Sequence, residues 1–267
     1  GDLIEWHISQ GTNAIVPCGT TGEASTLDYK EHYRVIDIAV KIVNKRIPVI
    51  AGTGANSTDE TIEITKHAQK SGADAALLVA PYYNKPTQEG LFRHYKTVAE
   101  KIDMPLVLYN VPGRTSVNIL PSTVARLAEI KNIVAIKEAT GDMKQVSEVI
   151  RLCGDRITVI SGDDFTTLPL MALGGKGVIS VTANIMPKEV SRMCALMLKG
   201  QYDKAREIHY KLEPLNAAMF IETNPIPAKT ALALMGKIQE EFRLPLCEMS
   251  PANKEKLQKV LQGYKLI

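Results

Sequence analysis

Lys137 is the residue of this sequence that is best placed to act as a nucleophile. It directly follows four apolar residues, IVAI at 133–136, a run typical of a strand buried on both faces of a parallel sheet. Burial disfavours the ammonium form of lysine, lowers its pKa and leaves an amine that can form an imine with a carbonyl compound. From position alone, a lysine that simply reaches solvent at the end of a strand is the favoured explanation of Lys137.

Tyr109 is the second candidate, because it ends the apolar run that comes before that of Lys137. We expect its phenol to face the same cavity, since the ends of neighbouring parallel strands meet there. An imine-forming lysine needs a group that moves protons while water is lost and bonds form, and a phenol can do this. The alternative is a tyrosine that only packs.

Further motifs are suited to binding carboxylates. The turn GTTGE at residues 19–23 offers backbone amides and two hydroxyls, which suits a carboxylate or a phosphate. An ordinary turn with a threonine as helix cap is the alternative. Arg114, just beyond Tyr109, can make a two-pronged contact with a second carboxylate. Gly162 and Asp164 follow a later apolar run and are expected to line the same mouth, unless Asp164 only caps the next helix.

The elements that must position these residues alternate between strand and helix from residue 12 to residue 184. Between the apolar runs, apolar side chains recur at helical spacing, as at Leu91, Tyr95, Val98 and Ile102. Repeated strand–helix units imply right-handed crossovers and a parallel sheet. The seven runs that we predict as strands are residues 14–16, 47–50, 75–79, 105–108, 133–136, 157–160 and 177–181.

Two architectures fit this alternation, an open doubly wound sheet and a closed barrel. Polar residues follow almost every run, and a barrel gathers all its strand ends around one mouth, whereas an open sheet uses mainly those at its switch point. No GxGxxG follows the first run, which disfavours the dinucleotide-binding form of the open sheet. The sequence therefore predicts an α/β fold of the (β/α)8 TIM-barrel type.

The strand count and the end of the alternation predict how the chain is divided. Seven of eight barrel strands are found, and residues 2–8 are typical of the end of a first helix, so we expect that the first strand is absent and the chain N-terminally truncated. After about residue 200, helices are predicted at 202–212, 215–220, 227–235 and 251–264. This gives a barrel of residues 1–200 and a C-terminal helical domain of residues 201–267.

Composition narrows the class of function. The formal charge of +3 is small and the basic residues are scattered, which argues against nucleic-acid binding. The four cysteines lie far apart without a CxxC pair, a pattern that suits a reducing cytoplasm, and no stretch predicts a membrane span or a signal peptide. The five histidines show neither HxH nor HExxH spacing, so no metal site or cofactor is predicted.

Taken together and in this order, the motifs point to a known family. The sequence resembles the dihydrodipicolinate synthase and N-acetylneuraminate lyase family of Schiff-base-forming barrels, from about residue 4 to the C-terminus. The matching motifs are GTTGE at 19–23, IPVIAGTGANST at 47–58, PYYNKPTQEG at 81–90, LYNVPGRT at 108–115, IKEATG at 136–141, SGDD at 161–164, GVISVTAN at 177–184 and ETNPIPAK at 222–229.

The resemblance assigns catalytic roles. It implies that Lys137 captures pyruvate as an imine and that Tyr109 relays protons. The relay is expected to run through the Thr20 hydroxyl to Tyr83, which in the family is contributed by a neighbouring subunit. The resemblance also implies a homotetramer built as a dimer of dimers.

The resemblance also assigns the substrates. It implies that Thr20 and Thr21 hold the carboxylate of pyruvate, that Gly162 and Ile179 supply backbone groups, and that Arg114 receives the carboxylate of aspartate semialdehyde. The expected reaction is the condensation of these two compounds in lysine and diaminopimelate biosynthesis. The alternative within the family is an N-acetylneuraminate or 2-keto-3-deoxy sugar acid lyase, where a residue other than arginine is expected at the position of Arg114.

Two further interpretations remain from the sequence. Some family members bind lysine between subunits, and the residues that fall on that site here are Ser25, His32, Asn56, Glu60 and Tyr82. A catalytically silent scaffold is a hypothesis from a different class of protein. The retained Lys137, Tyr109, Thr20 and Tyr83 argue against it.

Overall fold

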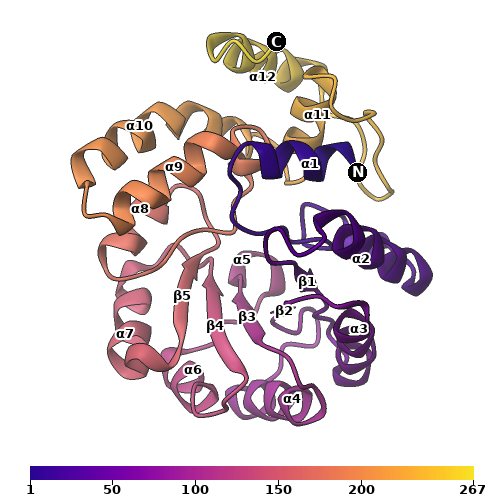
Figure 1. Cartoon of the computed structure of the whole chain (residues 1–267), viewed down its shortest axis with the longest axis vertical. Helices are drawn as coiled ribbons and strands as arrows, with labels where there is room; N and C mark the ends of the chain where they lie inside the picture. Colours follow the sequence, from indigo (N-terminus) through magenta and orange to yellow (C-terminus); the bar gives the residue numbers. More distant parts are fainter.

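The computed structural model describes all of residues 1–267, and its centre is a parallel sheet. The five strands pair in chain order (Figure 1) and are β1 (Ile50–Gly52), β2 (Ala75–Val79), β3 (Leu106–Asn110), β4 (Ile133–Glu138) and β5 (Thr158–Ser161). An α/β fold with a parallel sheet is thus confirmed.

The two outermost predicted strands differ from expectation. Each forms one isolated parallel bridge instead of a ladder, Ile15 with Val49 on one side and Val178 with Ser161 on the other. A segment at the margin of a sheet has backbone partners on one side only, which limits the pairing that holds it extended. The Ile15 and Val178 segments do not pair with each other, so the sheet is open between them.

Helices cover one face of this sheet. Figure 1 shows them around the outside of the strands: α2 (Tyr29–Val43), α3 (Thr58–Ser71), α4 (Gln88–Lys101), α6 (Pro121–Leu127) and α7 (Met143–Cys153). The predicted stripe of Leu91, Tyr95, Val98 and Ile102 is buried in the largest core cluster, of 24 residues. This cluster fixes which face of each strand points away from the helices.

Alternation along the strands decides where the candidate residues point. Leu108 and Ile136 belong to the helix-side core, whereas Tyr109 and Ala135 belong to a smaller cluster on the opposite face. Since side chains two apart in a strand share a face, Lys137 lies on the same side as Ala135. Tyr109 and Lys137 are therefore directed into the interior enclosed by the sheet.

The remaining helices are α1 (Asp2–Ser9), α5 (Pro112–Thr115), α8 (Thr167–Ala172), α9 (Pro187–Leu198), α10 (Tyr202–Ala218), α11 (Ile226–Leu234) and α12 (Pro251–Gly263), with short 3-10 turns η1 (Ala24–Thr26), η2 (Gly154–Arg156) and η3 (Thr182–Asn184). Helices α1, α11 and α12 gather at one end of the molecule with both termini (Figure 1), and Leu3 and Trp6 of α1 pack on the core cluster of α11 and α12. None of the helices combines the length and the apolar character needed to cross a bilayer.

One predicted break is wrong. Residues 202–212 and 215–220 were expected as two helices, but α10 runs continuously from Tyr202 to Ala218 with Pro214 inside it. Pro214 lies on the exposed side, where water can satisfy the carbonyl that loses its backbone donor. Leu212 and Leu215 are buried on either side of it and hold the helix together through packing.

Candidate active site

Lys137 and Tyr109 lie side by side on neighbouring strands. They are register partners, and Lys137 Nζ lies 4.0 Å from the centroid of the Tyr109 ring. A register shift between Leu106 and Val107 creates this pairing, because the ladder pairs Leu106 with Ile133 but Val107 with Ala135. Without the shift, Tyr109 would face Ile136 instead.

The environment of Lys137 raises the fraction that is neutral. Lys137 is 8% exposed, and burial lowers its pKa to about 8, with the positive charge of Arg114 acting in the same direction. The carboxylate of Asp164 opposes both effects. At pH 7 about one Lys137 in ten is then a free amine, against about one in three thousand for an ordinary lysine. A buried free amine can attack a carbonyl carbon.

Tyr109 sits in the same apolar surroundings. Burial raises the pKa of its phenol, while the Thr20 hydroxyl and the positive charge of Arg114 lower it. The phenol is therefore protonated near neutral pH and can donate a proton to a group formed on Lys137. The structure thus brings Lys137, Tyr109, Thr20 and Arg114 to one place.

Gly162 leaves the space that the lysine side chain occupies. A Cβ at this position would lie 2.9 Å from Lys137 Cε and 2.7 Å from Ala139 Cβ, closer than non-bonded carbons approach. The Gly162 amide donates to the carbonyl of Glu138 at 2.7 Å. Glycine therefore fits here because of the close packing against Ala139 and Lys137.

Asp164 is a buried acid in the loop after β5. Its Oδ2 accepts from the backbone amides of Val181 at 2.9 Å and Thr182 at 3.0 Å, and Oδ1 accepts from the hydroxyl of Ser180. Burial raises the pKa of Asp164, although these three donors act against the rise. Asp164 thus does not cap the next helix, α8, but binds residues 180–182 at the start of η3.

Glu138 was missed by the sequence analysis as a functional residue. It is 2% exposed and accepts from Asn110 Nδ2 at 3.1 Å, from Gln145 Nε2 at 3.3 Å and from the Thr140 amide at 2.8 Å. Because it directly follows Lys137, strand alternation places it on the helix side, and that pattern was the available signal. Its bond to Asn110 joins β3 to β4 behind the Tyr109–Lys137 pair.

The turn at residues 19–23 contacts the C-terminal part of the chain. Asn224 Nδ2 donates to Thr21 Oγ1 at 3.1 Å, and the Asn224 carbonyl accepts from Arg114 Nη2 at 3.1 Å. Neither Thr20 nor Thr21 caps a helix, since Asp28 is the N-cap of α2. The alternative of a threonine cap is therefore wrong: the Thr20 side chain contacts Tyr109, and the Thr21 hydroxyl is bonded to Asn224.

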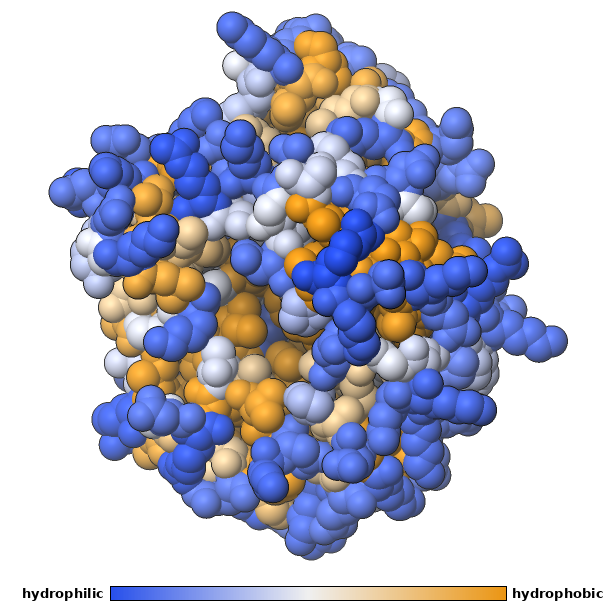
Figure 2. All heavy atoms as spheres, in the orientation of Figure 1, coloured by the Kyte–Doolittle hydropathy of each residue, from blue (hydrophilic) through white to orange (hydrophobic).

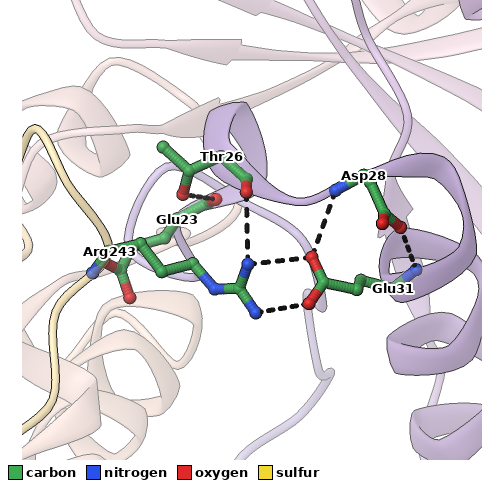
Figure 3. A network of polar contacts seen from close by, with 5 residues as sticks. All are labelled: Glu23, Thr26, Asp28, Glu31 and Arg243. Atoms are coloured by element: carbon green, nitrogen blue, oxygen red, sulfur yellow. Dashed lines mark hydrogen bonds and ion pairs between the residues drawn. The ribbon is translucent and has the colours of Figure 1, made fainter.

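A second set of contacts fixes this turn (Figure 3). The Arg243 guanidinium donates to both carboxylate oxygens of Glu31, at 2.8 and 2.7 Å, and to the Thr26 carbonyl at 3.3 Å. The Arg243 amide donates to Glu23 Oε1 at 3.0 Å, and Lys229 of α11 forms an ion pair with the same buried carboxylate. The C-terminal segment therefore anchors the turn that carries Thr20 and Thr21.

Ile179 packs beside Tyr109, whereas Tyr83 does not. The Ile179 amide donates to the Ser161 carbonyl at 2.9 Å, and its side chain packs on the cluster that contains Tyr109. Tyr83 is 88% exposed, in a loop between β2 and α4, with a φ of 72°. Within one chain, Tyr83 is not brought to Lys137.

The residues expected at a lysine-binding site lie on and beside α2 and α3. Glu60 is close to Tyr82, since its charge contributes to the raised pKa of that phenol after burial, and the Asn56 carbonyl accepts from Asn84 at 2.8 Å. His32 is buried, which lowers its pKa, and its Nδ1 has no hydrogen-bond partner. Ser25 is exposed in η1.

The face drawn in Figure 2 is hollowed in front of the strands, with apolar residues inside the hollow and polar residues around it. No group of three or more His, Cys, Asp or Glu side chains is arranged to hold a metal ion.

Comparisons with known proteins agree with this geometry. A family model described as the dihydrodipicolinate synthetase family matches residues 1–264. A 4-hydroxy-tetrahydrodipicolinate synthase of Thermodesulfovibrio yellowstonii is 76% identical, over 99% of this chain and 91% of that protein.

Solved structures are similar along the whole chain. A dihydrodipicolinate synthase of Acinetobacter baumannii, complexed with pyruvate, has a TM-score of 0.98 at 53% identity, over 100% of this chain and 91% of that one. A synthase of Cyanidioschyzon merolae with lysine bound has a TM-score of 0.96 at 40% identity, over 100% and 91% of the two chains.

Proposed function

The chain belongs to the dihydrodipicolinate synthetase family, and we propose that Lys137 is the nucleophile of its reaction. The activity is that of a 4-hydroxy-tetrahydrodipicolinate synthase, in lysine biosynthesis. The observation that carries the assignment of Lys137 is a buried lysine with a pKa of about 8 against the ring of Tyr109.

The reaction begins with the free amine of Lys137. It attacks the ketone carbon of pyruvate, and the resulting carbinolamine loses water to form an imine. Loss of a proton from the methyl group gives an enamine, whose carbon adds to the aldehyde of aspartate semialdehyde. Tyr109, with Thr20, donates and accepts the protons of these steps. Cyclisation through the amino group of the semialdehyde then displaces Lys137 and releases the product.

The two reactants each carry a carboxylate, and separate groups receive them. Thr20 and Thr21 hold the carboxylate of pyruvate, with backbone groups of Gly162 and Ile179 close by. Arg114 receives the carboxylate of the semialdehyde, for which a guanidinium offers two parallel donors. The positive charge of Arg114 near Lys137 supports this placement.

Tyr83 completes the proton relay from a neighbouring subunit, and the assembly is a homotetramer, a dimer of dimers. The 88% exposure of Tyr83 supports this, because an aromatic side chain so exposed in one chain is available to a partner.

The proposal also covers the finer details of the fold and the location of the protein. The sheet forms part of a (β/α)8 barrel in residues 1–200, with residues 201–267 as a helical domain, and the protein works in the cytoplasm. The order of the five parallel strands and the two flanking bridges supports the barrel.

Lysine acts as a regulator at Ser25, His32, Asn56, Glu60 and Tyr82. The support is the relative with lysine bound and the unpartnered Nδ1 of buried His32. A carboxylate such as that of Glu60 is suited to bind an amino group.

The test of Lys137 is the rate of condensation of pyruvate with aspartate semialdehyde. Replacing the nucleophile, Lys137→Ala, is expected to lower kcat roughly a thousandfold or more. Lys144→Ala, on the exposed side of α7, is the control and should leave kcat unchanged. A folded Lys137→Ala protein with normal kcat contradicts the assignment.

A further inference from the structure

Asn224 contacts two candidate binding groups that come from distant parts of the chain. Its side-chain Nδ2 donates to Thr21 Oγ1 at 3.1 Å, across 203 positions of sequence, and its backbone carbonyl accepts from Arg114 Nη2 at 3.1 Å. Asn224 is 4% exposed, so little water competes for these contacts. It therefore lies between the group that receives pyruvate and the group that receives the second reactant.

The segment that carries Asn224 is held on both sides. Before it, Glu222 Oε1 accepts from the Ser250 amide at 3.0 Å and from Asn253 Nδ2 at 2.9 Å. After it, Lys229 of α11 pairs with Glu23 at the end of the GTTGE turn. The segment of Asn224 is thus tied on one side to the residues around the start of α12 and on the other to the GTTGE turn.

No direct hydrogen bond joins the GTTGE turn to α5, which carries Arg114. The contact with Asn224 is the single side-chain hydrogen bond that Arg114 makes in the chain. A long arginine side chain without such an anchor samples many rotamers, and ordering it costs free energy on binding. The position of Arg114 relative to Thr21 therefore depends on Asn224.

We propose that Asn224 is a positioning residue that sets the separation between the two carboxylate-binding groups of the site. This rests on the proposed function, in which Thr21 and Arg114 receive the carboxylates of pyruvate and of an aldehyde acid. With a fixed separation, the site selects aldehyde substrates by the distance between their aldehyde and carboxylate groups. The acceptor class is accordingly a short-chain aldehyde acid, and Asn224 acts through Thr21 and Arg114 without touching the reacting carbons.

The first test compares Asn224→Ala with the nearly isosteric Asn224→Asp. The loss of one hydrogen bond to Thr21 should raise KM for pyruvate by roughly threefold to tenfold, with a smaller change in kcat. Asn224→Asp should raise it more, because a carboxylate then lies beside the carboxylate of pyruvate, and it preserves the volume needed for folding. Asn253→Ala loses a contact with the same segment but touches neither binding group, so its kinetics should match the unaltered chain.

The second test asks whether Asn224 acts through Thr21. In a Thr21→Val background, adding Asn224→Ala should change KM for pyruvate no further, because the hydroxyl that Asn224 positions is already gone. If the two effects multiply, or if folded Asn224→Ala and Asn224→Asp keep the normal KM, the positioning role is wrong.

Treatment of the unaltered chain with pyruvate and borohydride separates this proposal from the function on which it rests. Labelling of Lys137 together with normal kinetics in both Asn224 variants overturns only the role of Asn224. Absence of labelling overturns the proposed function itself, whatever the variants do.

Discussion

At the scale of single residues, the proposed chemistry depends on Lys137 being neutral often enough to react. The pKa of Lys137 is lowered to about 8, mainly by burial, with Arg114 acting in the same direction and Asp164 in the opposite one. Asp164 therefore has two effects, since it also holds the Val181 and Thr182 amides. Burial, adjusted by the opposing charges of Arg114 and Asp164, sets the pH at which the amine becomes available.

This balance predicts a pH dependence. The rate of imine formation should rise with pH and level off above the pKa of Lys137, about 8, because the neutral amine is the reactive form. Asp164→Asn removes the negative charge that raises the pKa of Lys137, so the rising limb of the pH–rate profile should move to lower pH. Stopped-flow measurement of imine formation with pyruvate checks it.

The matched control is Asp163→Asn. Asp163 is the neighbour of Asp164, and its Oδ2 accepts from Thr166 at 2.8 Å, but it is not among the groups that shift the pKa of Lys137. A limb that stays in place in Asp164→Asn, or moves to higher pH, contradicts the electrostatic assignment.

At the scale of elements, the sequence predicted the central parallel strands, but not the reduction of the two outermost ones to single bridges or the register of β3 and β4. The apolar runs of residues 75–79, 105–108 and 133–136 became β2, β3 and β4, since burial on both faces leaves a strong hydrophobic pattern. The register shift between β3 and β4, which brings Tyr109 opposite Lys137, leaves no such pattern, because it depends on contacts between strands.

The same limit explains which site residues were missed. Lys137, Tyr109 and Arg114 follow apolar runs and were found there. Asn224 lies 203 positions from Thr21, and only tertiary packing brings the two together. Glu138 carried a local signal, because a charged residue directly after Lys137 must point toward the helices.

Glu138 leads to a prediction for β3 and β4. In Glu138→Gln, the new amide group would face the donors of Asn110 and Gln145, so one donor loses its acceptor. We expect a loss of about 1–3 kcal/mol in the free energy of unfolding and a lower kcat. Chemical denaturation and steady-state kinetics measure the two effects.

Glu148→Gln, on the exposed side of α7, is the control for charge alone. If Glu138→Gln is as stable and as active as this control, the network behind Lys137 does not hold the strands.

At the scale of the whole molecule, the chain brings its C-terminal third back onto its first. Arg243 and Lys229 hold the turn before α2, and Asn224 holds Thr21 and Arg114. Tyr83 is the exception among the candidate residues, since it points out of the chain. In the proposed function, the site is therefore complete only when a partner subunit contributes its Tyr83.

Subunit mixing tests this dependence. Lys137→Ala and Tyr83→Phe proteins should each have low activity, but a mixture that exchanges subunits should recover part of it. In mixed assemblies, a Tyr83→Phe subunit keeps Lys137 and receives an intact Tyr83 from its partner. Activity of the mixture, followed alongside subunit exchange by native mass spectrometry, checks the prediction. No recovery after complete exchange means that Tyr83 does not act across the interface.

The most direct measurement of the central claim is the mass of the peptide that contains Lys137 after the protein is treated with pyruvate and borohydride. Reduction converts an imine into a stable amine, so the account predicts one pyruvate-derived increment, located on Lys137 and absent when pyruvate is omitted. An intact, folded protein without that increment, or with it on another lysine, would contradict the account.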